Sequence, residues 1–87
     1  MHTIVASVGR GGLNRTDDVR LVQELLNRHI QAPQRPLVVD GVISSRTIAA
    51  IEAFQRRVVN MHRPEGRINP GDRTMAALAS QAEQAPM

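Results

Sequence analysis

The chain of 87 residues contains no cysteine, lysine, tryptophan or tyrosine, and Phe54 is its single aromatic residue. Without cysteine it can form no disulfide, no thiolate nucleophile and no cysteine-ligated metal site. Without large rings its core must be aliphatic, and a hydrophobic fraction of 41% is enough for one small core. No apolar run approaches the roughly 18 to 20 residues of a membrane-spanning helix. The sequence therefore predicts one small domain, not a disulfide scaffold or a disordered chain.

The charged residues comprise eleven arginines and eight acidic residues, which give a formal net charge of +3. A small basic helical domain is often a DNA reader, so nucleic-acid binding is the main alternative from a different functional class. The arginines, however, are spread along the whole chain and interleaved with acids, so that no basic stripe is evident. We therefore expect no nucleic-acid partner.

Three segments have apolar residues at the i, i+3, i+4 spacing that is typical of amphipathic helices with one buried face. Proline at positions 33 and 36 ends the first of them. The buried stripe of the second is expected to include Ile51 and Phe54. The expected starts of the three helices are a cap within Asn14–Asp17, a cap at Ser44 or Ser45, and Asn69 followed by Pro70.

The remaining segments are expected to be extended or irregular. Residues 1–13 are predicted to form a short extended arm and loop, and residues 37–43 a brief strand broken by an Asp40-Gly41 turn. We therefore predict an all-α fold, a three-helix bundle with an N-terminal arm and Asp-Gly loops. The bundle would occupy residues 14–80, and residues 81–87 would form a frayed tail.

An internal repeat links the last two predicted helices to the loops before them. Residues 40–51 and 65–78 share an acidic-Gly turn, an isoleucine two residues after the glycine, and a helix that begins Arg-Thr. The glycines are expected at positive φ, and Ile43 and Ile68 beneath their turns. A loop-to-helix unit that simply packs well would explain the repeat without any ligand.

The order of these motifs resembles the small α-helical peptidoglycan-binding domain that accompanies many cell-wall hydrolases. The family pattern is a V-Q-x-L-L-N helix, then D-G-x-[apolar]-G-x-x-T, then A-[VI]-x-x-F-Q. Its counterparts here cover about residues 9–79, and one position departs from the pattern: Ser44 stands where a second glycine is usual. The matching residues are Asp18-Val19, Val22-Gln23, Leu25–Asn27, Val39–Ile43, Thr47, Ala50-Ile51 and Phe54-Gln55.

The resemblance implies a domain that binds bacterial cell wall and does no chemistry itself. Its ligand would be the peptide-bearing part of peptidoglycan, held in a shallow groove near the Asp-Gly loop and the start of the second helix. Arg46 adds a guanidinium that can pair with a stem-peptide carboxylate at a helix start. The expected ligand-binding residues are Asp40, Gly41, Ile43, Arg46, Thr47 and Gln55.

The resemblance also implies a place of action. Met1-His2 and the short apolar run that follows do not form a conventional signal peptide. We therefore expect delivery to the periplasm or cell wall by another route. The expected partners are peptidoglycan or its stem peptides, a cell-wall hydrolase or a secretion-system component, with no membrane partner. A protein-interaction or delivery module of a secretion or phage lysis system remains an alternative.

Enzyme chemistry and metal binding are not predicted. Glycoside hydrolysis needs two carboxylates facing each other across a cleft, whereas Asp17, Asp18 and Asp72 are expected in first helical turns, where capping explains them. The three histidines show no metal-binding spacing, so we expect no catalytic residues, metal or cofactor.

A DNA-binding helix-turn-helix is not predicted either, because the long loop between the second and third helices differs from the three- or four-residue turn of that motif.

Overall fold

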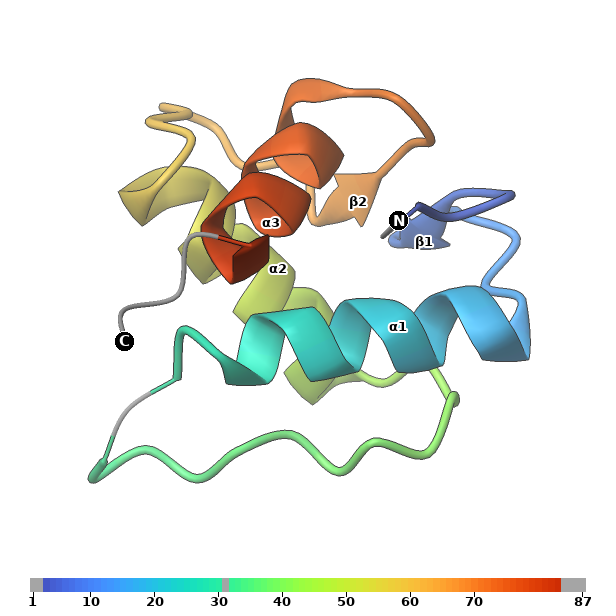
Figure 1. The fold of residues 1–87 in the computed structure, drawn as a ribbon, viewed down its shortest axis with the longest axis horizontal. Coiled ribbons are helices and arrows are strands. Elements are labelled where there is room, and N and C mark those ends of the chain that lie inside the picture. Colours follow the sequence, from blue (N-terminus) through green and yellow to red (C-terminus); the bar gives the residue numbers. More distant parts are fainter. Residues whose placement is uncertain (1–2, 31, 84–87) are drawn as a thin grey trace.

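The computed structural model describes residues 3–30 and 32–83, with side chains up to residue 80. Three helices are its main elements, so the predicted, mostly helical class is confirmed (Figure 1). A small antiparallel sheet adds to them, with Val8 opposite Ile68. Among the described residues no helix has both the length and the apolar character to cross a bilayer. The elements in chain order are β1 (Val8–Gly9), α1 (Thr16–Asn27), α2 (Ser45–Arg57), β2 (Arg67–Ile68) and α3 (Arg73–Glu83).

The helix α1 begins within the predicted Asn14–Asp17 segment, although no side chain caps it. Arg15 is the N-cap residue, and its side chain makes no capping hydrogen bond. Asn14 instead has a positive φ of 56°, and its side-chain Oδ1 accepts from the Gly9 amide at 2.7 Å. Because this side chain closes the glycine-rich turn before the helix, it is unavailable as a cap. Asp17 and Asp18 lie in the first turn as predicted.

The helix α2 begins as predicted, whereas α3 begins later than predicted. Ser44 is the N-cap of α2, and its Oγ accepts from the Thr47 amide at 3.3 Å. The predicted start of α3 at Asn69-Pro70 is wrong, because residues 69–72 form a turn with Gly71 at a φ of 78°. Asp72 closes that turn and caps α3, since its carboxylate accepts from the Asn69 and Met75 amides, both at 2.9 Å.

The predicted strand at residues 37–43 is also wrong, because this segment is extended but pairs with no strand of the described chain. After α1 the chain turns and runs back along that helix toward the start of α2 (Figure 1). Asn27 holds it there: its Oδ1 accepts from the Leu37 amide at 2.7 Å, and its Nδ2 donates to the Leu37 carbonyl at 2.9 Å. One side-chain amide thus replaces the hydrogen bonds of a neighbouring strand.

The core lies between the helices and includes the N-terminal arm. The helix α1 contacts both α2 and α3, and β1 lies against α1 and α2. The arm is fixed by the buried carboxylate of Asp18, which accepts from the Val5 and Ala6 amides at 3.0 and 2.9 Å. The buried apolar residues are Ile4, Val8, Val19, Val22, Leu25, Leu26, Leu37, Ile51, Phe54, Ile68, Met75 and Leu78.

Candidate functional site

A buried glutamine of α1 organises the Asp-Gly loop. The side chain of Gln23 is 1% exposed, and its Oε1 accepts from the Asp40 and Gly41 amides at 3.1 and 2.9 Å. Its Nε2 lies 3.2 Å from Asp40 Oδ1, the Val42 carbonyl and Thr47 Oγ1. One amide therefore joins α1, the loop and the first turn of α2. We call this arrangement the first glutamine latch.

A second latch repeats the arrangement one helix later. Gln55 of α2 is fully buried, and its Oε1 accepts from the Gly66 amide at 2.9 Å. Its Nε2 donates to the Arg67 carbonyl at 3.0 Å and lies 3.2 Å from Thr74 Oγ1 at the start of α3. The internal repeat seen in the sequence is therefore a repeat of helix-to-loop hydrogen bonding.

Backbone conformation explains the glycine of the first loop. Gly41 has a φ of 74°, and a Cβ there would lie 2.6 Å from Thr16 Cγ2. Both the positive φ and the close approach of α1 require glycine. Ser44, by contrast, has a φ of −148° and a ψ of 169°. This is ordinary extended backbone, so the serine that stands where the family pattern has glycine causes no strain, and it caps α2.

Asp40 remains exposed at the tip of this loop, although its carboxylate has internal partners. Its Oδ1 accepts from the Val42 amide at 3.0 Å and from Gln23 Nε2 at 3.2 Å. These hydrogen bonds, the Val42 amide first, hold the pKa of the Asp40 carboxyl below its ordinary value. Asp40 therefore orders its own loop and keeps its negative charge at neutral pH.

Three of the six expected ligand-binding residues line one small hollow of about 150 Å³. They are Asp40, Arg46 and Thr47. Arg46 is exposed, whereas Thr47 is 1% exposed and faces Gln23. Of the other three, Ile43 packs against the core, Gly41 is buried behind the loop, and Gln55 belongs to the second latch. The hollow is lined by Gln23, Leu37, Val38, Asp40, Ser44, Arg46 and Thr47.

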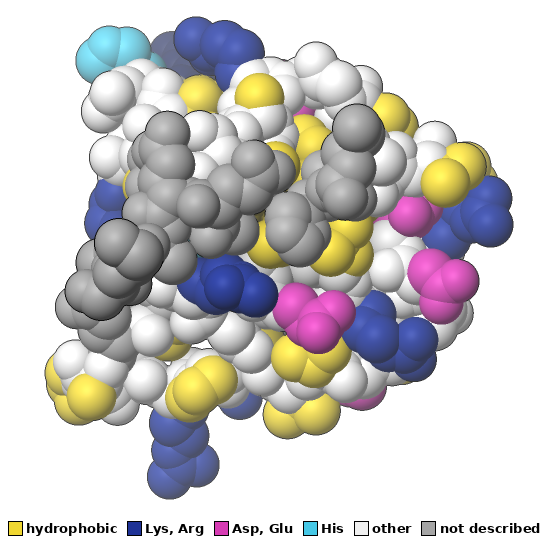
Figure 2. Space-filling model, in the orientation of Figure 1, with side chains coloured by type: hydrophobic (Ala, Val, Ile, Leu, Met, Phe, Trp, Pro, Cys, Tyr) yellow, Lys and Arg dark blue, Asp and Glu magenta, His cyan; other side chains and the backbone are white. Residues whose placement is uncertain are grey.

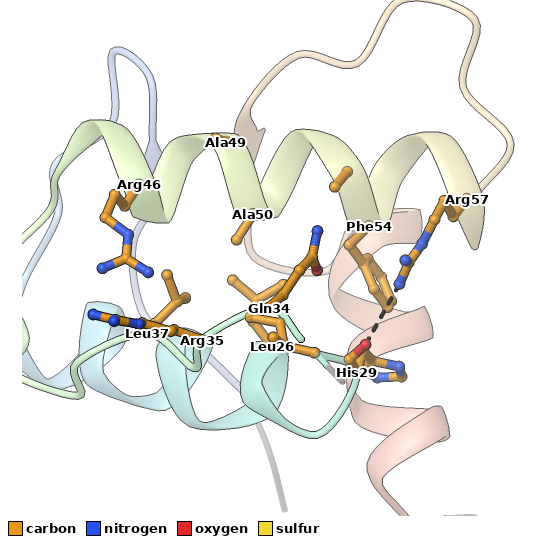
Figure 3. A pocket seen from close by; sticks show the side chains of 12 residues that line it. Leu26, His29, Gln34, Arg35, Leu37, Arg46, Ala49, Ala50, Phe54 and Arg57 are labelled. Carbon is orange, nitrogen blue, oxygen red and sulfur yellow. Dashed lines mark hydrogen bonds between the residues drawn. The ribbon is translucent and has the colours of Figure 1, made fainter. Parts of the chain in front are cut away.

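A larger groove of about 450 Å³ adjoins this hollow, and Leu37 and Arg46 belong to both. It lies between α2, the end of α1 and the segment that follows α1 (Figure 3). Its lining includes the buried apolar side chains of Leu26, Leu37 and Phe54. The helix α2 contributes Arg46, Ala49, Ala50, Ala53, Phe54 and Arg57, which all lie on one helical face.

Positive charge surrounds the groove. Arg35 and Arg46 line one end of the groove, and Arg57 lies at the other end (Figure 3). Arg57 Nη2 lies 3.5 Å from the His29 carbonyl oxygen. Burial, and then the charge of Arg57, lower the pKa of His29, whose ring packs edge-on against Phe54 at 4.9 Å. The imidazole is therefore neutral at pH 7, and the arginines supply the charge.

The sequence did not reveal Arg35 and Arg57 as groove residues. The three arginine positions come from α2 and from the irregular segment after α1, and only the fold brings that segment over α2. The sequence did contain a partial indication of the groove, because Arg46, Ala50 and Arg57 have the spacing of residues on one helical face, and that face carries small side chains. No group of three or more potential metal-ligating side chains occurs among the described residues.

Comparison with known proteins gives one informative match. The family model described as "Putative peptidoglycan binding domain" matches residues 15–78, which include α1, the Asp40 loop and α2. No curated protein and no solved structure matches the chain. The matched part is more than half of the sequence and contains the predicted V-Q and D-G motifs. The chain therefore belongs to the peptidoglycan-binding domain family.

Proposed function

We propose that this domain is a non-catalytic module that binds peptidoglycan through its stem peptides and holds a partner or a fused activity at the bacterial wall. Family membership carries the proposal, because the matched residues build both the hollow and the groove. Tethering of this kind raises the local concentration of the attached activity at its substrate. The proposed place of action is the periplasm or cell wall, where peptidoglycan is found.

The composition of the surface favours the peptide over the glycan as the recognised part. Sugar faces are commonly bound by stacking on aromatic rings, and Phe54, the only Trp, Tyr or Phe of the chain, is 2% exposed. Stem peptides carry carboxylates, which the planar guanidinium of arginine binds through two parallel hydrogen bonds. Arg46 is exposed at the border of the hollow and the groove, where such a carboxylate has access.

The distribution of charge does not favour nucleic acid. On the face shown in Figure 2, arginine side chains lie apart from one another, with acidic side chains between several of them. Phosphate binding along a duplex needs basic groups that follow the backbone. The arginine cluster of the groove is local and lies against an apolar surface, which suits a short peptide better than a charged polymer.

Sedimentation with purified sacculi tests the proposal. We expect the wild-type protein to pellet with sacculi, and Arg46→Gln to bind about tenfold more weakly, since a hydrogen bond to a charged group contributes roughly 1.5–3 kcal/mol. Arg63→Gln is the matched control, because Arg63 is also exposed but lies in the loop after α2. Far-UV circular dichroism checks that both variants are folded.

Two further experiments distinguish binding of the stem peptide from binding of the glycan and from binding of nucleic acid. Sacculi whose stem peptides have been removed by an amidase are expected to lose binding, and unchanged binding to them would refute peptide recognition. A mobility-shift assay with duplex DNA at physiological salt is expected to show no complex. If the protein remains in the supernatant with intact sacculi, the proposed function is wrong, and a role in protein interaction or delivery becomes the better hypothesis.

A further inference from the structure

The dimensions of the groove define what can lie in it. Arg46 and Arg57 are eleven residues apart on α2, so their Cα atoms are separated by about 16 Å along the helix axis. Between them α2 lines the groove with the methyl groups of Ala49, Ala50 and Ala53 and with the ring of Phe54. An extended chain advances about 3.3 Å per residue, so this length corresponds to roughly five extended residues. Methyl groups leave room for backbone to approach the helix.

The arginines that line the groove have no acidic partner among the residues that the structure describes. Arg35, Arg46 and Arg57 line the groove, and none of the described residues that line it is acidic. Within the described parts of the chain none of these three arginines forms an ion pair, whereas Arg10 is paired with Glu52 at 2.7 Å. Arg35 and Arg46 line the same end of the groove (Figure 3), and two like charges at one end repel each other. A carboxylate between them would turn that repulsion into two attractions.

We propose that the groove between α2, the end of α1 and the segment after α1 binds an acidic peptide of about four or five residues in extended form. One carboxylate lies between Arg35 and Arg46, a second lies near Arg57, and small aliphatic side chains rest on the alanine surface. The inference rests on the proposed function, because stem peptides combine carboxylates with alanine. It goes further by naming the groove, the two ends at which arginines bind the carboxylates of the peptide, and the preference for small side chains.

Calorimetric titration with the stem tetrapeptide released from sacculi by an amidase tests this assignment. Arg35→Gln and Arg57→Gln are each expected to weaken binding about tenfold, and amidation of the peptide's carboxyl groups to weaken it about a hundredfold. Ala53→Leu is expected to abolish binding, because it places a bulky side chain in the groove at an exposed position. Ala76→Leu is the matched control, since Ala76 is exposed on α3 away from the groove, and it should bind like wild type.

The possible outcomes separate the groove from the proposed function. If Ala53→Leu and both arginine variants bind the tetrapeptide like wild type while the protein still pellets with sacculi, the groove assignment is wrong and peptidoglycan binding stands. If the wild-type protein binds neither sacculi nor tetrapeptide, the proposed function fails, and the groove assignment fails with it. Loss of binding in Ala53→Leu with retention in Ala76→Leu supports the groove, provided that both variants give the wild-type circular dichroism spectrum.

Discussion

The first glutamine latch makes a quantitative prediction for the free energy of unfolding. Gln23→Leu retains an apolar side chain of similar size but removes the amide that serves three loop residues and Thr47. The Gly41 amide is buried, so it would be left without its acceptor, at a cost of roughly 1–3 kcal/mol. The Asp40 amide and carboxylate and the Val42 carbonyl belong to exposed residues, so they can form hydrogen bonds with water instead. Adding about 1 kcal/mol for the other lost bonds gives a total loss of about 3 kcal/mol.

This loss is large in relation to the stability of a small domain. A chain of 87 residues is expected to have a free energy of unfolding of roughly 4–13 kcal/mol. Urea denaturation followed by far-UV circular dichroism measures the change, because the chain has no tryptophan for fluorescence. Gln34→Leu is the control: Gln34 is exposed, so we expect a change of at most about 0.5 kcal/mol. Equal midpoints for the two variants would show that the latch contributes no net stability and would refute the reasoning.

Three more predictions concern ionisable side chains. Because the pKa of Asp40 is lowered in the folded state, its carboxylate contributes stability that is present above about pH 4 and is lost as the pH falls through the folded-state pKa. In urea titrations at acid pH, the free energy of unfolding of Asp40→Asn should therefore depend less on pH than that of the wild type. Because burial lowers the pKa of His29, its imidazole should titrate in NMR below the ordinary histidine value of about 6.5; a midpoint at or above that value would contradict the packing described. Asp18→Asn should cost about 1.5–3 kcal/mol in thermal or urea unfolding, since two arm amides lose a charged acceptor, whereas Asp17→Asn at an exposed position should change stability little.

Helices were the part of the fold that local sequence patterns predicted well. Apolar spacing and a serine cap are sufficient to identify α1 and the start of α2, because both signals act within a few residues. The start of α3 was mispredicted because Asn69-Pro70 is a good local cap signal, yet Asp72 forms two hydrogen bonds with the turn and the helix. Competition between two neighbouring caps depends on the conformation of the intervening glycine, which the pattern does not specify.

Long-range side-chain contacts were the part that the sequence did not predict. Nothing in the residues around Leu37 shows that the Asn27 amide takes the place of a partner strand. Likewise, Gln55 was expected at the ligand because it matches a family motif, and the structure shows it hydrogen-bonded beneath the Gly66 loop. The arginine-lined groove requires the segment after α1 to lie over α2, and that path is fixed by tertiary packing.

The pairing of β1 with β2 limits how far the N-terminal end of this protein can be truncated. The family match begins at Arg15, but the hydrophobic core begins at Ile4 and includes Val8. A fragment trimmed to the matched residues would expose Ile68, the partner of Val8, and would leave the Asp18 carboxylate without the two amides that it accepts from. The cooperative folding unit is therefore longer than the stretch by which the family is identified, and fusions that retain the arm should be the ones that stay soluble and folded.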